Sequence, residues 1–128
     1  LDAHYVSYTP DGVHSWAGNK LDRAPSTVVT LGYEHRFRAR GGQLKAGLAA
    51  RASSAYTIGV PSQLLQYPIP SRTSADASLG FSPDDAGWSV HALVKNIGGK
   101  VAPIAIDSFG MLVPSDPRMV DVRLDYRF

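Results

Sequence analysis

The chain has 128 residues, enough for one small domain, with 13 Lys and Arg against 11 Asp and Glu. It has no cysteine, which excludes a disulfide framework and a thiolate metal site. The charges are interleaved rather than gathered into a basic stripe, so we expect no nucleic-acid partner. No apolar run approaches the roughly 20 residues that a membrane-spanning helix needs, whereas a membrane β-strand needs only about half as many.

Alternation of apolar and polar side chains predicts six β-strands, because successive side chains of a strand point to opposite faces. The tight turn at 39–42 is expected to take its positive φ from Gly41 and Gly42. The alanines of the third strand favour a helix by propensity, but its charged residues keep strand parity. In chain order, the expected strands are residues 1–8, 25–38, 43–53, 73–81, 88–96 and 119–128.

The last ten residues alternate most strictly. A one-residue shift of this strand would turn four charged side chains onto its apolar face, so its register is well determined. Its apolar face is Val120, Val122, Leu124, Tyr126 and Phe128, and the opposite face is Met119, Asp121, Arg123, Asp125 and Arg127.

Charged residues obey one rule in the last five expected strands: all lie on the polar face. A charge facing lipid costs about 2–4 kcal/mol at the membrane midplane, so a lipid-facing surface demands this rule. A soluble β-sandwich also alternates, and the rule alone does not separate the two classes. The residues that follow it are Glu34, Arg36, Arg38, Lys45, Arg51, Asp76, Lys95, Asp121, Arg123, Asp125 and Arg127.

Connection length separates the two classes. The connections at 9–24, 54–72 and 97–117 are long, and those at 39–42 and 82–87 are short. Up-and-down membrane barrels have short periplasmic turns and longer extracellular loops, whereas a sandwich has no reason to sort its connections in this way. Aromatic residues of apolar parity beside the short turns and the C-terminus then predict a girdle at the periplasmic interface: Phe37, Phe81, Trp88, Tyr126 and Phe128.

These patterns predict an all-β fold, an antiparallel up-and-down transmembrane β-barrel. Six strands are too few to close it, since even eight leave only enough interior for side chains. We therefore expect residues 1–128 to form the C-terminal segment of one larger barrel domain. The chain begins without Met or a signal segment, which fits either a processed protein or a piece of a longer one.

Several motifs resemble the C-terminal end of TonB-dependent outer-membrane receptors. Residues 18–25 resemble the Gly/Asn-x-Leu-x-x-Ala-Pro stretch that leads into a late barrel strand, and residues 94–97 resemble the Val-x-Asn-Leu end of the penultimate strand. Residues 116–118 resemble the Pro-Pro-Arg lead into the last strand, with Asp in the first position. Residues 126–128 are similar to the aromatic-x-Phe terminus. Residues 98–101 depart from the family's Asp-Lys-Lys-Tyr type of continuation.

The resemblance implies a barrel of about 22 strands with an N-terminal plug that is not in this chain. It implies uptake of a scarce nutrient such as a ferric siderophore across the bacterial outer membrane, driven by TonB through the missing N-terminal part. The expected partners are outer-membrane lipid, the rest of the barrel, the plug and the barrel-assembly machinery, which would read Tyr126 and Phe128. The alternatives are a passive porin-like barrel and a soluble β-sandwich binding module.

Candidate chemistry is sparse, and we expect neither an enzyme nor a cofactor. The four histidines lack metal-ligand spacing, so no metal site is predicted. Ser78, His91 and Asp76 are residues that any polar barrel wall would carry, and no Gly-x-Ser-x-Gly motif accompanies them. In the long loop at 54–72, Tyr56 and Tyr67 are candidates for gripping a ligand; the equally weighted alternative is that this loop packs on itself.

Overall fold

The computed structural model describes residues 1–39, 41–60, 64–107 and 109–128. Within these residues the chain is all-β, and there is no helix that is long and apolar enough to cross a membrane. The chain divides into two compact units. The first comprises Leu1–Val29, Ala52–Thr73 and Val101–Ser115, and the second comprises Thr30–Arg51, Ser74–Lys100 and Asp116–Phe128.

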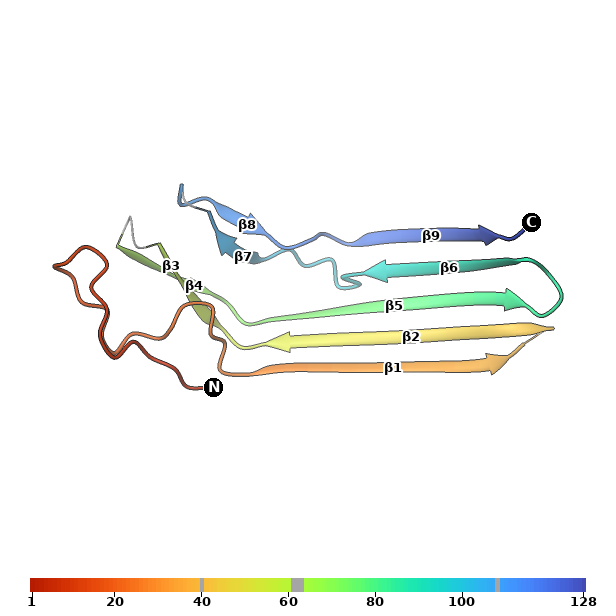
Figure 1. Ribbon diagram of the computed structural model, residues 1–128, viewed down its shortest axis with the longest axis horizontal. Coiled ribbons are helices and arrows are strands. Elements are labelled where there is room, and N and C mark those ends of the chain that lie inside the picture. The colour runs from red at the N-terminus through yellow and green to blue at the C-terminus, as the bar shows by residue number, and fades with distance from the viewer. Residues whose placement is uncertain (40, 61–63, 108) are drawn as a thin grey trace. The chain divides into compact units, whose positions relative to one another are not determined.

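A five-stranded sheet provides most of the second unit. Its order is β1-β2-β5-β6-β9, and each strand runs antiparallel to its neighbours (Figure 1). Five of the six expected strands are thereby confirmed, and their order follows the chain. The strands are β1 (Val28–Arg38), β2 (Gly42–Ser53), β5 (Arg72–Pro83), β6 (Trp88–Lys95) and β9 (Met119–Tyr126).

The register confirms the predicted faces. β6 and β9 pair Val90 with Leu124 on the apolar face and His91 with Arg123 on the polar face. β5 and β6 continue this arrangement, and Phe81 pairs with Val90. β1 and β9 are the edges of the sheet: among the described residues, β1 pairs only with β2 and β9 only with β6, so the sheet is open.

The expected first strand at 1–8 is wrong. Within the described chain, this segment forms only an isolated bridge between His4 and Lys20. The reason is a local aromatic cluster: Tyr5 and Tyr8 stack with ring centroids 5.2 Å apart, and both contact Trp16. Side chains three residues apart cannot point the same way from a regular strand, so packing overrides the short alternating pattern.

Two of the expected long loops contain hairpins that the alternation did not predict. Residues 54–72 include β3 (Tyr56–Val60) and β4 (Leu65–Ile69), and residues 97–117 include β7 (Pro103–Ile106) and β8 (Leu112–Pro114). Both hairpins are antiparallel two-stranded sheets and belong to the first unit.

The core of the first unit lies on one face of the β3–β4 hairpin. Ile58, Val60 and Ile69 are buried there together with Ile106 of β7. The opposite face of the hairpin carries Thr57, Gly59 and Gln66, and the N-terminal segment lies against it: Asp22 pairs with Thr57 in an isolated parallel bridge. The hairpin therefore packs between two segments that are distant from it in sequence.

The turn between β1 and β2 differs in one detail from its prediction. Gly41 has a φ of 72°, but Gly42 does not have a positive φ and belongs to β2. Gly42 is required for space instead, because a Cβ atom there would lie 2.7 Å from the backbone oxygen of Ser82 and 2.8 Å from Cζ of Phe81.

Candidate functional site

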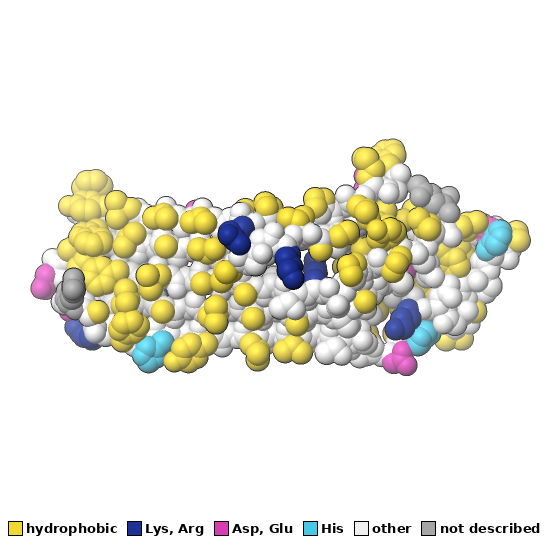
Figure 2. All heavy atoms as spheres, turned by 180° about the vertical axis from the view of Figure 1, so that it is seen from behind, with side chains coloured by type: hydrophobic (Ala, Val, Ile, Leu, Met, Phe, Trp, Pro, Cys, Tyr) yellow, Lys and Arg dark blue, Asp and Glu magenta, His cyan; other side chains and the backbone are white. Residues whose placement is uncertain are grey.

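The apolar face of the five-stranded sheet is the largest candidate surface. Its side chains are exposed across all five strands: Leu31, Val122 and Leu124 are 68%, 68% and 69% exposed. Apolar residues so exposed are not a protein core, and no described element of the second unit covers them. Hydrophobic side chains spread along the sheet in Figure 2. A contiguous apolar surface of this kind marks a contact with lipid or with another apolar surface.

The opposite face of the sheet carries the charged residues, and several of them are paired. Lys45 Nζ lies 2.8 Å from Glu34 Oε2 across β1 and β2, and Arg36 Nη2 lies 3.0 Å from the other oxygen of Glu34. Arg123 Nη2 lies 2.7 Å from Asp125 on β9. These pairs are solvent-exposed, so they contribute little to the folding stability of the sheet.

The predicted aromatic residues gather at the end of the sheet that carries the short turns. The rings of Phe81 and Trp88 lie 6.0 Å apart, Trp88 pairs with Tyr126, and the rings of Tyr126 and Phe128 lie 5.0 Å apart. Arg127 N donates to Gly87 O at 2.6 Å, which fixes the C-terminus beside the β5–β6 turn as predicted. We call Phe37, Phe81, Trp88, Tyr126 and Phe128 the aromatic end.

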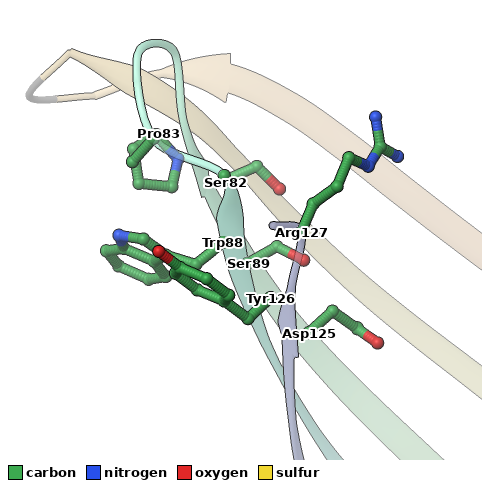
Figure 3. A pocket seen from close by; sticks show the side chains of 9 residues that line it. Ser82, Pro83, Trp88, Ser89, Asp125, Tyr126 and Arg127 are labelled. Atoms are coloured by element: carbon green, nitrogen blue, oxygen red, sulfur yellow. The ribbon is translucent and has the colours of Figure 1, made fainter.

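A shallow depression of about 300 Å³ lies at the aromatic end. Figure 3 shows the rings of Trp88 and Tyr126 together on one side of their strands, with Asp125 and Arg127 on the other side. The depression therefore joins an aromatic wall to polar groups at the rim of the sheet. Amphipathic rings in this position are favoured where apolar and aqueous surroundings meet.

Tyr56 and Tyr67, the predicted ligand-gripping residues, lie on the apolar face of the β3–β4 hairpin. Both are half-buried and pack against the cluster around Ile58 and Ile69. Tyr56 Oη donates to the backbone oxygen of Ile104 at 3.1 Å, which ties the two hairpins of this unit together. The two rings therefore pack against their own hairpin and against β7 of the other long connection.

The histidines are dispersed. His35 stacks on Tyr33 of the apolar face, His91 lies over Gly80 on the charged face, and His14 contacts Asp11 in the N-terminal segment. The described ranges contain no group of three or more potential metal ligands.

The Ser78, His91 and Asp76 set is not assembled as a triad. Asp76 Oδ1 accepts from Asn96 N at 2.9 Å, the Ser78 side chain lies over Gly47, and His91 lies over Gly80. No hydrogen bond joins any two of the three in the described structure.

Asn96 has a role that the sequence reasoning did not assign. Its φ is 48°, and its Nδ2 donates to the backbone oxygens of Lys100 at 2.9 Å and Asp116 at 3.0 Å. It therefore holds together the two ends of the long connection between β6 and β9. The signal was available, because Asn tolerates positive φ far better than most residues and stands at the last position of the expected strand.

Two groups in the N-terminal segment have altered acidity. Burial and the nearby negative charge of Asp22 raise the pKa of the Tyr5 phenol. Hydrogen bonds from the His14 side chain and from the backbone N–H groups of His14 and Val13 hold the pKa of Asp11 far below its usual range. These effects reflect local packing and turn formation.

Comparisons of the chain with protein-family models, with curated proteins and with solved structures found no match.

Proposed function

We propose that this chain forms C-terminal strands of a transmembrane β-barrel in the bacterial outer membrane, and that the barrel is a TonB-dependent receptor. The observation that carries the proposal is the exposed apolar face of the sheet, which continues over five strands and contains no Asp, Glu, Lys or Arg. Contact of such a face with lipid has no hydrophobic cost, whereas its exposure to water is unfavourable.

Three further features support the membrane assignment. The charged side chains share the other face, where a polar interior would accept them. The two long connections of the sheet, from β2 to β5 and from β6 to β9, leave from one end of the sheet, and the short turns leave from the other. The aromatic end lies beside the short turns, where a membrane–water interface would favour its rings.

The open edges of β1 and β9 support a barrel larger than these five strands. Unpaired backbone groups are very costly in lipid, so β1 and β9 each require a further strand on their open side. In the proposed receptor the remaining strands and the plug belong to the rest of the protein. The ligand class, a ferric siderophore, comes from the motif resemblance alone.

Membrane fractionation tests the barrel. The full-length protein, produced in a Gram-negative host, is expected in the outer-membrane fraction and should migrate differently on gels before and after boiling. Monodisperse behaviour of the 128-residue chain in water without detergent would contradict the proposal, because the apolar face would then need no lipid.

A second experiment separates a receptor from a porin. Uptake of radiolabelled ferric siderophore through the full-length protein should stop in a host that lacks TonB, whereas diffusion through a porin would continue. TonB-independent uptake of small solutes would support the porin and contradict the receptor.

A further inference from the structure

The polar face of the β3–β4 hairpin contains a buried junction between three segments of the first unit. Gly59 pairs with Gln66 across the hairpin, and Thr57 shares their face because side chains two residues apart on a strand point the same way. The N-terminal segment closes over this face: Arg23 N donates to Thr57 O at 2.8 Å, and Asp22 pairs with Thr57.

Glycine at position 59 allows the Asp22 carboxylate to occupy this junction. A Cβ atom at Gly59 would overlap Asp22 Oδ2 and would lie 2.7 Å from Cζ3 of Trp16. The carboxylate therefore lies directly above the strand, beside Thr57 and near Gln66 on the neighbouring strand. Thr57 and Gln66 are diagonal neighbours on this face, with Cβ atoms about 7–8 Å apart, which leaves room for one small molecule between their side chains and the Asp22 carboxylate.

Three side-chain atoms of the junction are buried and have no hydrogen-bond partner among the described residues. They are Asp22 Oδ1, Thr57 Oγ1 and Gln66 Nε2. Buried polar atoms in folded proteins are almost always hydrogen bonded, to protein or to ordered water. The concentration of three such atoms at one junction therefore indicates a common partner.

The chemistry of the three atoms selects that partner. Asp22 Oδ1 accepts hydrogen bonds, Thr57 Oγ1 accepts or donates, and Gln66 Nε2 only donates. The amide of Gln66 is oriented by Asn19, whose Nδ2 donates to Oε1 at 2.7 Å. A cation is disfavoured because the partly positive Nε2 hydrogens of Gln66 would face it. An anion is disfavoured because the Asp22 carboxylate would repel it.

We propose that these three atoms bind one buried water molecule. The water donates to Asp22 Oδ1 and Thr57 Oγ1 and accepts from Gln66 Nε2, which gives it the three hydrogen bonds typical of buried water. It thereby joins the N-terminal segment to both strands of the hairpin. The site lies entirely within the first unit and does not depend on the proposed function.

Hydrogen exchange in the folded chain tests the bridge. Thr57→Val removes the hydroxyl while keeping the shape of the side chain, and exchange of the Arg23 amide should become roughly tenfold faster as the N-terminal segment opens more often. Thr57→Ser keeps the hydroxyl and should leave exchange nearly unchanged, as should Thr73→Val on an exposed strand position. Equal rates in the Val and Ser variants would overturn the proposal.

A high-resolution crystal structure provides an independent test. We expect density for one water within hydrogen-bond distance of the three atoms, and its loss in Thr57→Val. Direct donation from Gln66 Nε2 to Asp22 Oδ1 with no intervening density would overturn the proposal. A melting temperature that rises with added Ca²⁺ or Na⁺ in the wild type but not in Asp22→Asn would also overturn the proposal, because the occupant would then be a cation.

Discussion

At the scale of single residues, Gly59 shows how a position with no side chain determines local packing. Its missing Cβ leaves the space that the Asp22 carboxylate and the Trp16 ring occupy. Trp16 is only 5% exposed and forms the centre of the aromatic cluster with Tyr5 and Tyr8. One added methyl group at position 59 therefore disturbs both the polar junction and the aromatic cluster.

We expect Gly59→Ala to destabilise the first unit by about 1–3 kcal/mol, the usual cost of overpacking. The matched control is Gly32→Ala in β1, where an added Cβ meets no atom within 4 Å. Chemical unfolding followed by Trp16 fluorescence measures both variants, with Trp88→Phe as the common background so that Trp16 is the reporter. Equal stability of the two glycine variants would show that Asp22 and Trp16 move aside at little cost.

Asp11 gives a pH prediction at the same scale. Its Oδ1 accepts from Val13 N at 2.9 Å and His14 N at 2.7 Å, and its other oxygen contacts His14 Nδ1. These contacts lower the pKa of Asp11 in the folded turn. A lowered folded pKa stabilises the turn above the ordinary carboxyl pKa of about 3.9, and this stabilisation disappears as pH falls through the lowered value.

The turn at residues 11–14 should therefore persist at pH 4 and open only in stronger acid. Carboxyl carbon shifts from NMR titration measure this directly, and Asp11→Asn, which cannot titrate, is the control. An Asp11 midpoint near 3.9 or above would mean that the hydrogen bonds to His14 and Val13 are not maintained in solution.

At the scale of elements, strict alternation was sufficient to predict the sheet. β9 and β6 pair as their parity requires, because a one-residue slip would place charges such as Arg123 among apolar side chains. The hairpins were not predicted, since Pro68 in β4 and Pro103 and Pro114 in the β7–β8 hairpin argue against strands. Proline is tolerated in these two-stranded sheets because every strand there is an edge.

We expect the same new charge to cost much more on one face of β9 than on the other. Val122→Arg places a charge on the apolar face and should cost about 2–4 kcal/mol of folding free energy in lipid vesicles. Asp121→Arg adds the same side chain one residue away on the charged face and should cost much less. Urea titration of the lipid-inserted protein compares them, and equal costs would mean that the apolar face does not contact lipid.

At the scale of the whole molecule, the sequence could not predict that the chain separates into two units of different character. The first unit has a buried core of its own around Ile58 and Ile69, whereas the sheet of the second unit leaves its apolar face exposed. The contacts that form the first unit join residues far apart in the chain, such as Tyr56 and Ile104. Local alternation contains no information about such pairings.

The C-terminal phenylalanine gives a prediction at this scale. Phe128 is fully exposed and contacts Tyr126 within the aromatic end. Deleting it from the full-length protein should reduce outer-membrane insertion severalfold while leaving ligand affinity of the inserted fraction unchanged. The control is Phe109→Ala, which removes another exposed ring, 81% exposed, from the β7–β8 turn. Normal insertion of the deletion variant, measured by heat-modifiable gel migration, would contradict an assembly role.

The position of the β3–β4 hairpin between residues 16–23 and β7 also determines when the first unit completes its folding. Ile106 lies far beyond Ile58, Val60 and Ile69 in the sequence. Contacts at such sequence separation carry a loop-closure cost and form late. Until β7 docks, the apolar face of the hairpin lacks Ile106, so the buried cluster is complete only when the second hairpin has packed against the first.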